Sequence, residues 1–174
     1  MGRDALDLLL YLMDEAFRGP GIEETKEAQA LLPNLATVGE HHWRAKPVGV
    51  VGTVEAITIH VGACKLMYDD HAFGAGRLRF GEPPVEPWAD GEAPMADAVR
   101  WLEGTHEVLV DHVRTLPDDA ELVRPRRTNW GELRETRWIL SVMLQHDLYH
   151  AGEINHLRSQ LSGDDRWRFQ QLGF

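Results

Sequence analysis

The sequence predicts an all-α protein, a bundle of long helices around one hydrophobic core. Apolar residues recur at helical spacing in several long segments, and glycine or proline follows the end of each segment. No stretch has the alternation of apolar and polar residues that would indicate a strand. With 174 residues, of which 43% are hydrophobic and 26% charged, the chain is large enough to bury a core. We therefore expect a single domain covering residues 1–174.

Four long helices and one long connection are expected. Thr53 is a plausible N-cap for the second helix, and Gly163 follows the end of the last. The stretch 24–38 contains Pro33 and predicts one or two short helices. Residues 74–94 are rich in glycine and proline and form a loop of a length that is typical of functional loops. The expected long helices cover residues 4–17, 53–72, 95–116 and 131–161.

Composition argues against several classes of partner. The net charge of −10 repels nucleic-acid phosphates, and we interpret the short basic cluster Arg124, Arg126 and Arg127 as a solvated loop. No apolar run approaches the roughly 20 residues that span a membrane. The single cysteine, Cys64, excludes a disulfide within the chain, so we expect a location in the reducing cytoplasm. From the charge and the short apolar runs, we expect neither nucleic acid nor a membrane as a partner.

Two histidines lie one turn apart on the apolar face of the last predicted helix. On a helical wheel, the face centred on His146 also carries His150 and Glu153, whereas Asp147 and Arg158 fall well away from it. A buried imidazole needs partners for both ring nitrogens, so two neighbouring imidazoles compete for few partners. A shared divalent metal would satisfy both. The alternative is a pair of hydrogen-bonded core histidines.

A third histidine, His60, lies at the centre of an apolar stripe on the helix predicted over 53–72. Small residues, Ala56 and Ala63, flank it and would allow close approach of another helix or an ion. Three imidazoles would leave an open coordination position, which is the form of a catalytic site rather than of a structural one. The alternative for His60 by itself is again a hydrogen-bonded core histidine.

The segment HDLYHAGEINHLR, from His146 to Arg158, resembles the last helix of the DinB/YfiT-like family of metal-dependent enzymes. TVEAITIHVGACKLMYDD, from Thr53 to Asp70, resembles the family's second core helix with its single histidine, and HWRAKP, from His42 to Pro47, resembles the segment before it. The resemblance covers about residues 6–161.

The resemblance implies a four-helix bundle with up-down-down-up topology and a right-handed crossover after the second helix. It implies one divalent metal on His60, His146 and His150, with zinc or nickel preferred to iron or manganese, and frequent homodimers. It also implies a small-molecule substrate, because relatives include transferases and isomerases that use a low-molecular-weight thiol.

Several further residues have open roles. Glu153, where many relatives of that family carry Gln, could be an extra ligand, an orienting partner of a histidine, a general base, or a structural hydrogen-bond acceptor. Cys64 could be a ligand or a nucleophile, although a small buried residue is the simpler interpretation. Trp88, in the long loop, could cap a substrate pocket. Most of the six tryptophans are expected to anchor the core or an interface; they are Trp43, Trp88, Trp101, Trp130, Trp138 and Trp167.

Two functions from different classes follow. The first is a metal-dependent enzyme, a thiol S-transferase, isomerase or hydrolase acting on a small electrophile, with Glu153 as the catalytic side chain. The second is a non-catalytic stress protein that binds a metal or a small ligand. An open metal position favours the first, and a closed four-ligand site favours the second.

Overall fold

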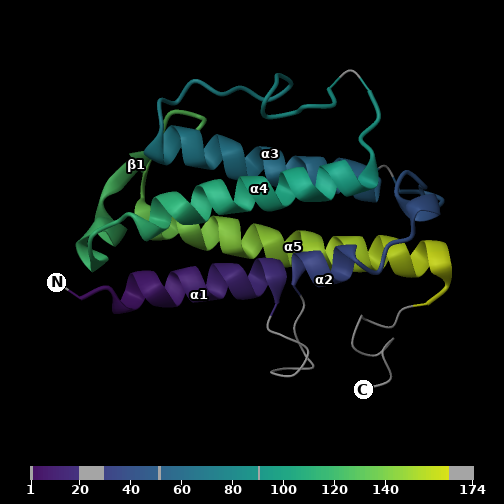
Figure 1. The fold of residues 1–174 in the computed structure, drawn as a ribbon, viewed down its shortest axis with the longest axis horizontal. Helices are drawn as coiled ribbons and strands as arrows, with labels where there is room; N and C mark the ends of the chain where they lie inside the picture. Colours follow the sequence, from purple (N-terminus) through teal and green to yellow (C-terminus); the bar gives the residue numbers. More distant parts are fainter. Residues whose placement is uncertain (1, 20–29, 51, 90, 165–174) are drawn as a thin grey trace. The chain divides into compact units, whose positions relative to one another are not determined.

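The computed structural model describes residues 2–19, 30–50, 52–89 and 91–164, and it is mostly helical (Figure 1). This confirms the all-α class. Two compact units are formed, one by Met1–Tyr11 with Thr58–Met143 and the other by Leu12–Ile57 with Leu144–Phe174. The helices are α1 (Asp4–Arg18), α2 (Leu31–Leu35), α3 (Val54–Phe73), α4 (Met95–Arg114) and α5 (Thr136–Ser162), with 3-10 turns at Glu40–His42 and Asp119–Val123 and strands β1 (Pro125–Arg127) and β2 (Leu133–Glu135).

The long helices begin and end close to where local signals predict. The hydroxyl of Thr53 accepts a hydrogen bond from the backbone N–H of Ala56 at 3.1 Å, so Thr53 caps α3 as expected. Gly163 follows α5 with a φ of +69°, and its N–H donates to the carbonyl of Ser159 at 2.9 Å. Pro33 lies within the short helix α2. Residues 20–29, which include the first part of the stretch 24–38, lie outside the described residues, and so does Trp167.

The expectation of a last helix beginning near residue 131, with no strand before it, is wrong. β1 and β2 form an antiparallel hairpin, and α5 begins only at Thr136. Gly131 has a φ of +92°, a conformation that turns the chain and that few other residues adopt. The strands are too short for a periodic pattern, so pairing across the turn decides their conformation.

Within the first unit, α3 and α4 run parallel. A Cβ placed on Gly62 would lie 2.2 Å from the ring of Trp101, so this ring of α4 packs directly on the backbone of α3 there. Further along both helices, Nδ1 of His112 lies 2.7 Å from a carboxylate oxygen of Asp69. From the first contact to the second, the residue number rises on both α3 and α4, so the two helices run in the same direction. A helix of 20 residues is about 30 Å long, so the connection must return along that length.

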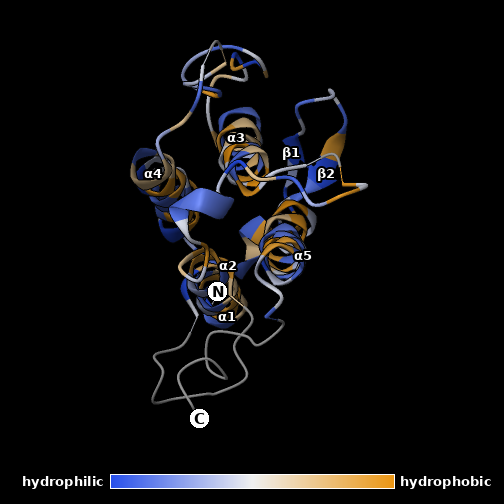
Figure 2. Ribbon diagram, turned by 90° about the vertical axis from the view of Figure 1, so that its right-hand side faces the viewer, coloured by the Kyte–Doolittle hydropathy of each residue, from blue (hydrophilic) through white to orange (hydrophobic). Residues whose placement is uncertain are grey.

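That connection, residues 74–94, is packed on the helices. Val85 is fully buried against Ala63 and Met67 of α3. The ring of Trp88 meets Trp101 edge to face, with centroids 5.7 Å apart. In Figure 1 this connection, drawn in teal, runs beside α3, and in the turned view of Figure 2 it again lies next to α3. Its length therefore follows from the parallel arrangement of α3 and α4.

The second unit fixes the start of α3. Trp43 is buried, and its carbonyl accepts a hydrogen bond from the N–H of Glu55 at 3.0 Å. The carboxylate of Glu55 also accepts from Arg44 at 3.0 Å. In the part of the chain that the structure describes, no helix is both long and apolar enough to cross a membrane.

Asp70 holds the first turn of the connection. Its carboxylate accepts hydrogen bonds from the backbone N–H groups of Ala75, Arg77 and Leu78, at 3.2, 2.6 and 2.8 Å. Burial raises the pKa of Asp70, but these three hydrogen bonds outweigh burial, and the pKa lies below its ordinary value.

We expect Asp70→Ala to lower the free energy of unfolding by about 1–2 kcal/mol at pH 7, because three amides lose their acceptor. Since the pKa of Asp70 is lower in the folded chain, its stabilisation is complete above the unfolded pKa and disappears as pH falls through the folded value. Urea unfolding of wild type and variant from pH 2 to 7 measures both. The exposed Asp111, paired with Arg114, provides the control Asp111→Ala. Equal losses in both variants would contradict this role.

Candidate metal centre

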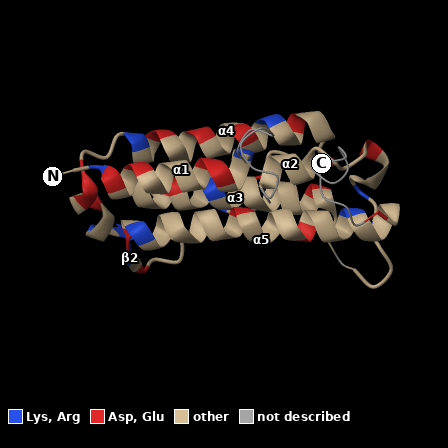
Figure 3. Ribbon diagram, turned by 90° about the horizontal axis from the view of Figure 1, so that it is seen from below, with Lys and Arg blue, Asp and Glu red and all other residues tan. Residues whose placement is uncertain are grey.

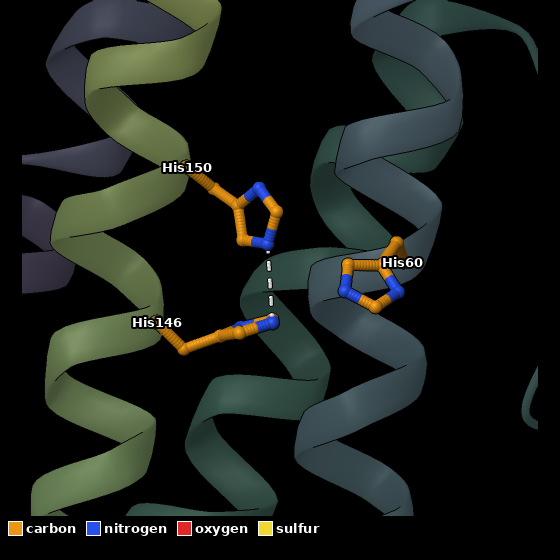
Figure 4. A group of neighbouring side chains, drawn as sticks. All are labelled: His60, His146 and His150. Carbon is orange, nitrogen blue, oxygen red and sulfur yellow. Dashed lines mark hydrogen bonds between the residues drawn. The ribbon is translucent and has the colours of Figure 1, made fainter. Parts of the chain in front are cut away.

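The helix α5 brings two imidazoles together on successive turns. His146 and His150 are four residues apart, and their ring centroids lie 4.3 Å apart with planes at 76° (Figure 4). Nε2 of His150 lies 3.1 Å from Nε2 of His146. His150 is buried and His146 half-buried. The expected burial of this pair is therefore confirmed.

The separation of the two Nε2 atoms fits a shared metal ion. Two nitrogens each about 2.0–2.1 Å from one ion, at angles of about 90–110°, lie about 2.9–3.4 Å apart. Two facing lone pairs repel unless a proton or a cation lies between them. The pair can therefore share one proton in a hydrogen bond or share one ion.

Glu153 orients His150. A carboxylate oxygen of Glu153 lies 2.7 Å from Nδ1 of His150. The carboxylate accepts a hydrogen bond from the Nδ1–H group. The Nε2 lone pair of the neutral ring is then directed at His146. Of the roles left open for Glu153, this geometry favours the orienting one. The side chain of Glu153 is still 41% exposed, so solvent reaches it.

His60, on α3, completes the group. One nitrogen from each of His60, His146 and His150 lies within 4.8 Å of the others, and Figure 4 shows the ring of His60 on α3 with the two α5 rings. His60 is exposed rather than set in a core stripe, and its neighbour Ala56 is exposed too. That part of the expectation is wrong, because His60 lies on an edge of α3 that other elements leave open to water.

Cys64 lies beside His60 with its sulfur 3.7 Å from Nε2. Burial raises the pKa of the thiol to about 11 against the smaller, opposite effect of Lys65. The thiol is therefore protonated near neutral pH, which favours the interpretation of Cys64 as a small buried residue.

Some buried polar residues had no role in the sequence analysis. Asp147 and Arg158, which lie off the histidine face of α5, are 1% and 3% exposed, and Lys65 is fully buried. The guanidinium of Arg158 donates to the side-chain oxygen of Asn155 and to the carbonyl of Asp164, both at 2.8 Å. A helical wheel centred on the histidines could not predict the burial of Asp147 and Arg158, because it assumes that α5 is covered on one face, whereas α5 is covered on more than one.

The fold and the histidine group together define a helical protein with three imidazoles able to hold one metal ion. Comparison with protein families agrees, because the sequence model of the DinB superfamily matches residues 24–154, most of the chain. The chain belongs to the DinB superfamily. A comparison with curated proteins found no match.

We expect Glu153→Ala to weaken zinc binding by about 10–100-fold, because the variant no longer selects the tautomer of His150 that presents its Nε2 lone pair. Glu153→Gln should lose much less, since its amide oxygen still accepts from Nδ1. Competition with a chelating dye measures both affinities. The control is Gln160→Ala, which removes an exposed polar side chain of the same helix. Identical affinities for Glu153→Ala and wild type would contradict the orienting role.

Proposed function

We propose that the protein is a metal-dependent enzyme whose divalent ion is held by His60, His146 and His150. The observation that carries the proposal is the double contact of His150, with Glu153 at Nδ1 and His146 at Nε2. A histidine oriented by a carboxylate is the usual partner arrangement of a metal ligand. Three imidazoles suit zinc or nickel first, and iron or manganese next.

The exposure of His60 supports an open centre rather than a closed one. Such an ion supplies a Lewis acid that polarises a carbonyl or lowers the pKa of a thiol or water. Around it, His146 and His150 are positioned by the backbone of α5. Glu153 holds the Nδ1 proton of His150 and can pass a proton to solvent or substrate.

The substrate we propose is a small electrophile, and the co-substrate a low-molecular-weight thiol, which makes the protein a thiol-dependent transferase or isomerase. This extends the resemblance of the last-helix motif to that part of the family. A hydrolase using water is the related possibility within the same centre.

The topology of the helices, up-down-down-up with a crossover, is part of the same proposal. The parallel contacts of α3 and α4, with the long connection between them, support the two middle helices of an up-down-down-up bundle with a crossover. The single domain over residues 1–174, a homodimer and a cytoplasmic location stay predictions from sequence. The alternative function is a stress protein that binds a metal or a small ligand without turnover.

We expect tag-free protein to contain about one divalent ion per chain, and we expect His150→Ala to lose the ion and any turnover together. The control is His156→Ala, which removes an exposed imidazole of the same helix that contacts Gln160. Elemental analysis and a turnover screen with thiols and small electrophiles give both readouts. Metal without turnover would favour the binding protein. No metal would contradict the enzyme and would leave only a small ligand for the binding protein.

A chelator should lower the melting temperature without unfolding the chain at 25 °C, because the packed helices form a core of their own. Loss of a ligand present at about 100 times its Kd costs about 2.7 kcal/mol, or roughly 5–10 °C for a chain of this size. Circular dichroism melts with and without chelator measure the shift, and re-addition of the metal should reverse it. Unfolding at 25 °C would show the ion to be structural.

A further inference from the structure

Three aromatic rings form a continuous surface in the first unit. The centroids of Tyr68, on α3, and Trp130, in the hairpin turn, lie 5.8 Å apart, and those of Trp130 and Trp138, on α5, lie 6.1 Å apart. Both pairs meet edge to face. Trp130 is 48% exposed and Trp138 38%. We call this surface the aromatic shelf.

The turn holds Trp130 in position. The N–H of Thr128 donates to the carbonyl of Glu132 at 2.8 Å, and the N–H of Glu132 donates to the hydroxyl of Thr128 at 3.1 Å. Hydrogen bonds from the Trp130 indole and from Arg134 lower the pKa of Glu132, so its carboxylate is ionised and ties the indole to the turn. The shelf is therefore preorganised, which reduces the entropy that a ligand must lose on binding.

The size and charge of the shelf fit a small neutral group. With Leu133, which is 65% exposed, it offers roughly 300–400 Å² of apolar surface, against about 800 Å² for each partner of a stable protein complex. The surrounding arginines are paired with acidic side chains, Arg134 with Glu132 at 2.7 Å and Arg137 with Glu135 at 2.6 Å. Basic and acidic positions both occur at β2 on the ribbon of Figure 3. The guanidinium of Arg134 also covers Trp138, 5.3 Å from its ring centroid.

The shelf lies along the same helix as the metal centre. Tyr68 follows His60 by eight residues of α3, or roughly 12 Å of helix rise. Cys64 lies between them, in contact with His60. An elongated small molecule could therefore contact both ends of this stretch.

We propose that the aromatic shelf formed by Tyr68, Trp130 and Trp138 binds the neutral, aromatic end of an elongated substrate whose other end reaches His60. The reach to His60 rests on the proposed metal centre, whereas binding at the shelf does not. The shelf makes the protein selective for substrates with an aromatic or flat apolar group about 12 Å from the reacting atom.

The first test measures binding of N-phenyl-1-naphthylamine, a neutral aromatic probe, by its fluorescence. Trp130→Leu keeps an apolar side chain in the turn but removes the flat ring, and should weaken binding by about 3–10-fold. The control Tyr11→Leu removes an aromatic ring that is 57% exposed on α1, and should leave the affinity unchanged. The same result is expected after metal removal. Equal affinity in Trp130→Leu and wild type overturns the shelf.

The second test uses cobalt-loaded protein and the thiolate-to-cobalt absorbance. Tyr68→Leu, at the end of the shelf nearest to His60, should weaken the binding of 6-phenylhexane-1-thiol and leave that of 2-mercaptoethanol unchanged. Equal weakening of both thiols, or of neither, overturns the reach to His60. If no cobalt binds while the naphthylamine still distinguishes Trp130→Leu from wild type, the metal centre fails and the shelf stands.

Discussion

The position of His150 between two partners is the constraint on which the candidate centre depends. With Glu153 at Nδ1 and His146 at Nε2, the ring cannot rotate without losing a contact of 2.7 or 3.1 Å. The tautomer is then selected by a carboxylate rather than by solvent. Since all three side chains come from two turns of one helix, this arrangement needs only an intact α5. The third imidazole, His60, is the part that depends on the rest of the fold.

The placement of His60 depends on how α3 is held. At its start, Thr53 caps the helix and Trp43 anchors Glu55. Along its length α3 packs parallel to α4, and the ring of Trp101 fits against Gly62 because glycine has no side chain. The parallel arrangement requires a long return connection, which covers one side of α3 through Val85. His60 is on an edge that these contacts leave open, and that exposure distinguishes an accessible centre from a buried structural one.

The basic cluster near the hairpin, predicted as a solvated loop, differs from that prediction at Arg126. Arg126 is not solvated, because it donates to Glu121 at 2.6 Å and lies over the ring of Phe73 at 4.5 Å. Arg124 also pairs with Glu121, at 3.1 Å. Arg126 therefore anchors the hairpin to α3, whereas Arg124 and Arg127 are exposed, as the sequence predicts. The exposed aromatic rings are the unusual feature of this region.

The sequence by itself determined the long helices and the pairing of His146 with His150, because helical period and i, i+4 spacing are local properties. It also carried the resemblance that agrees with the DinB superfamily. Only the tertiary structure decided the exposure of His60, the hairpin before α5 and the burial of Asp147. Burial depends on residues distant along the chain, and strands of three residues form only when the partner strand is in place to pair with them.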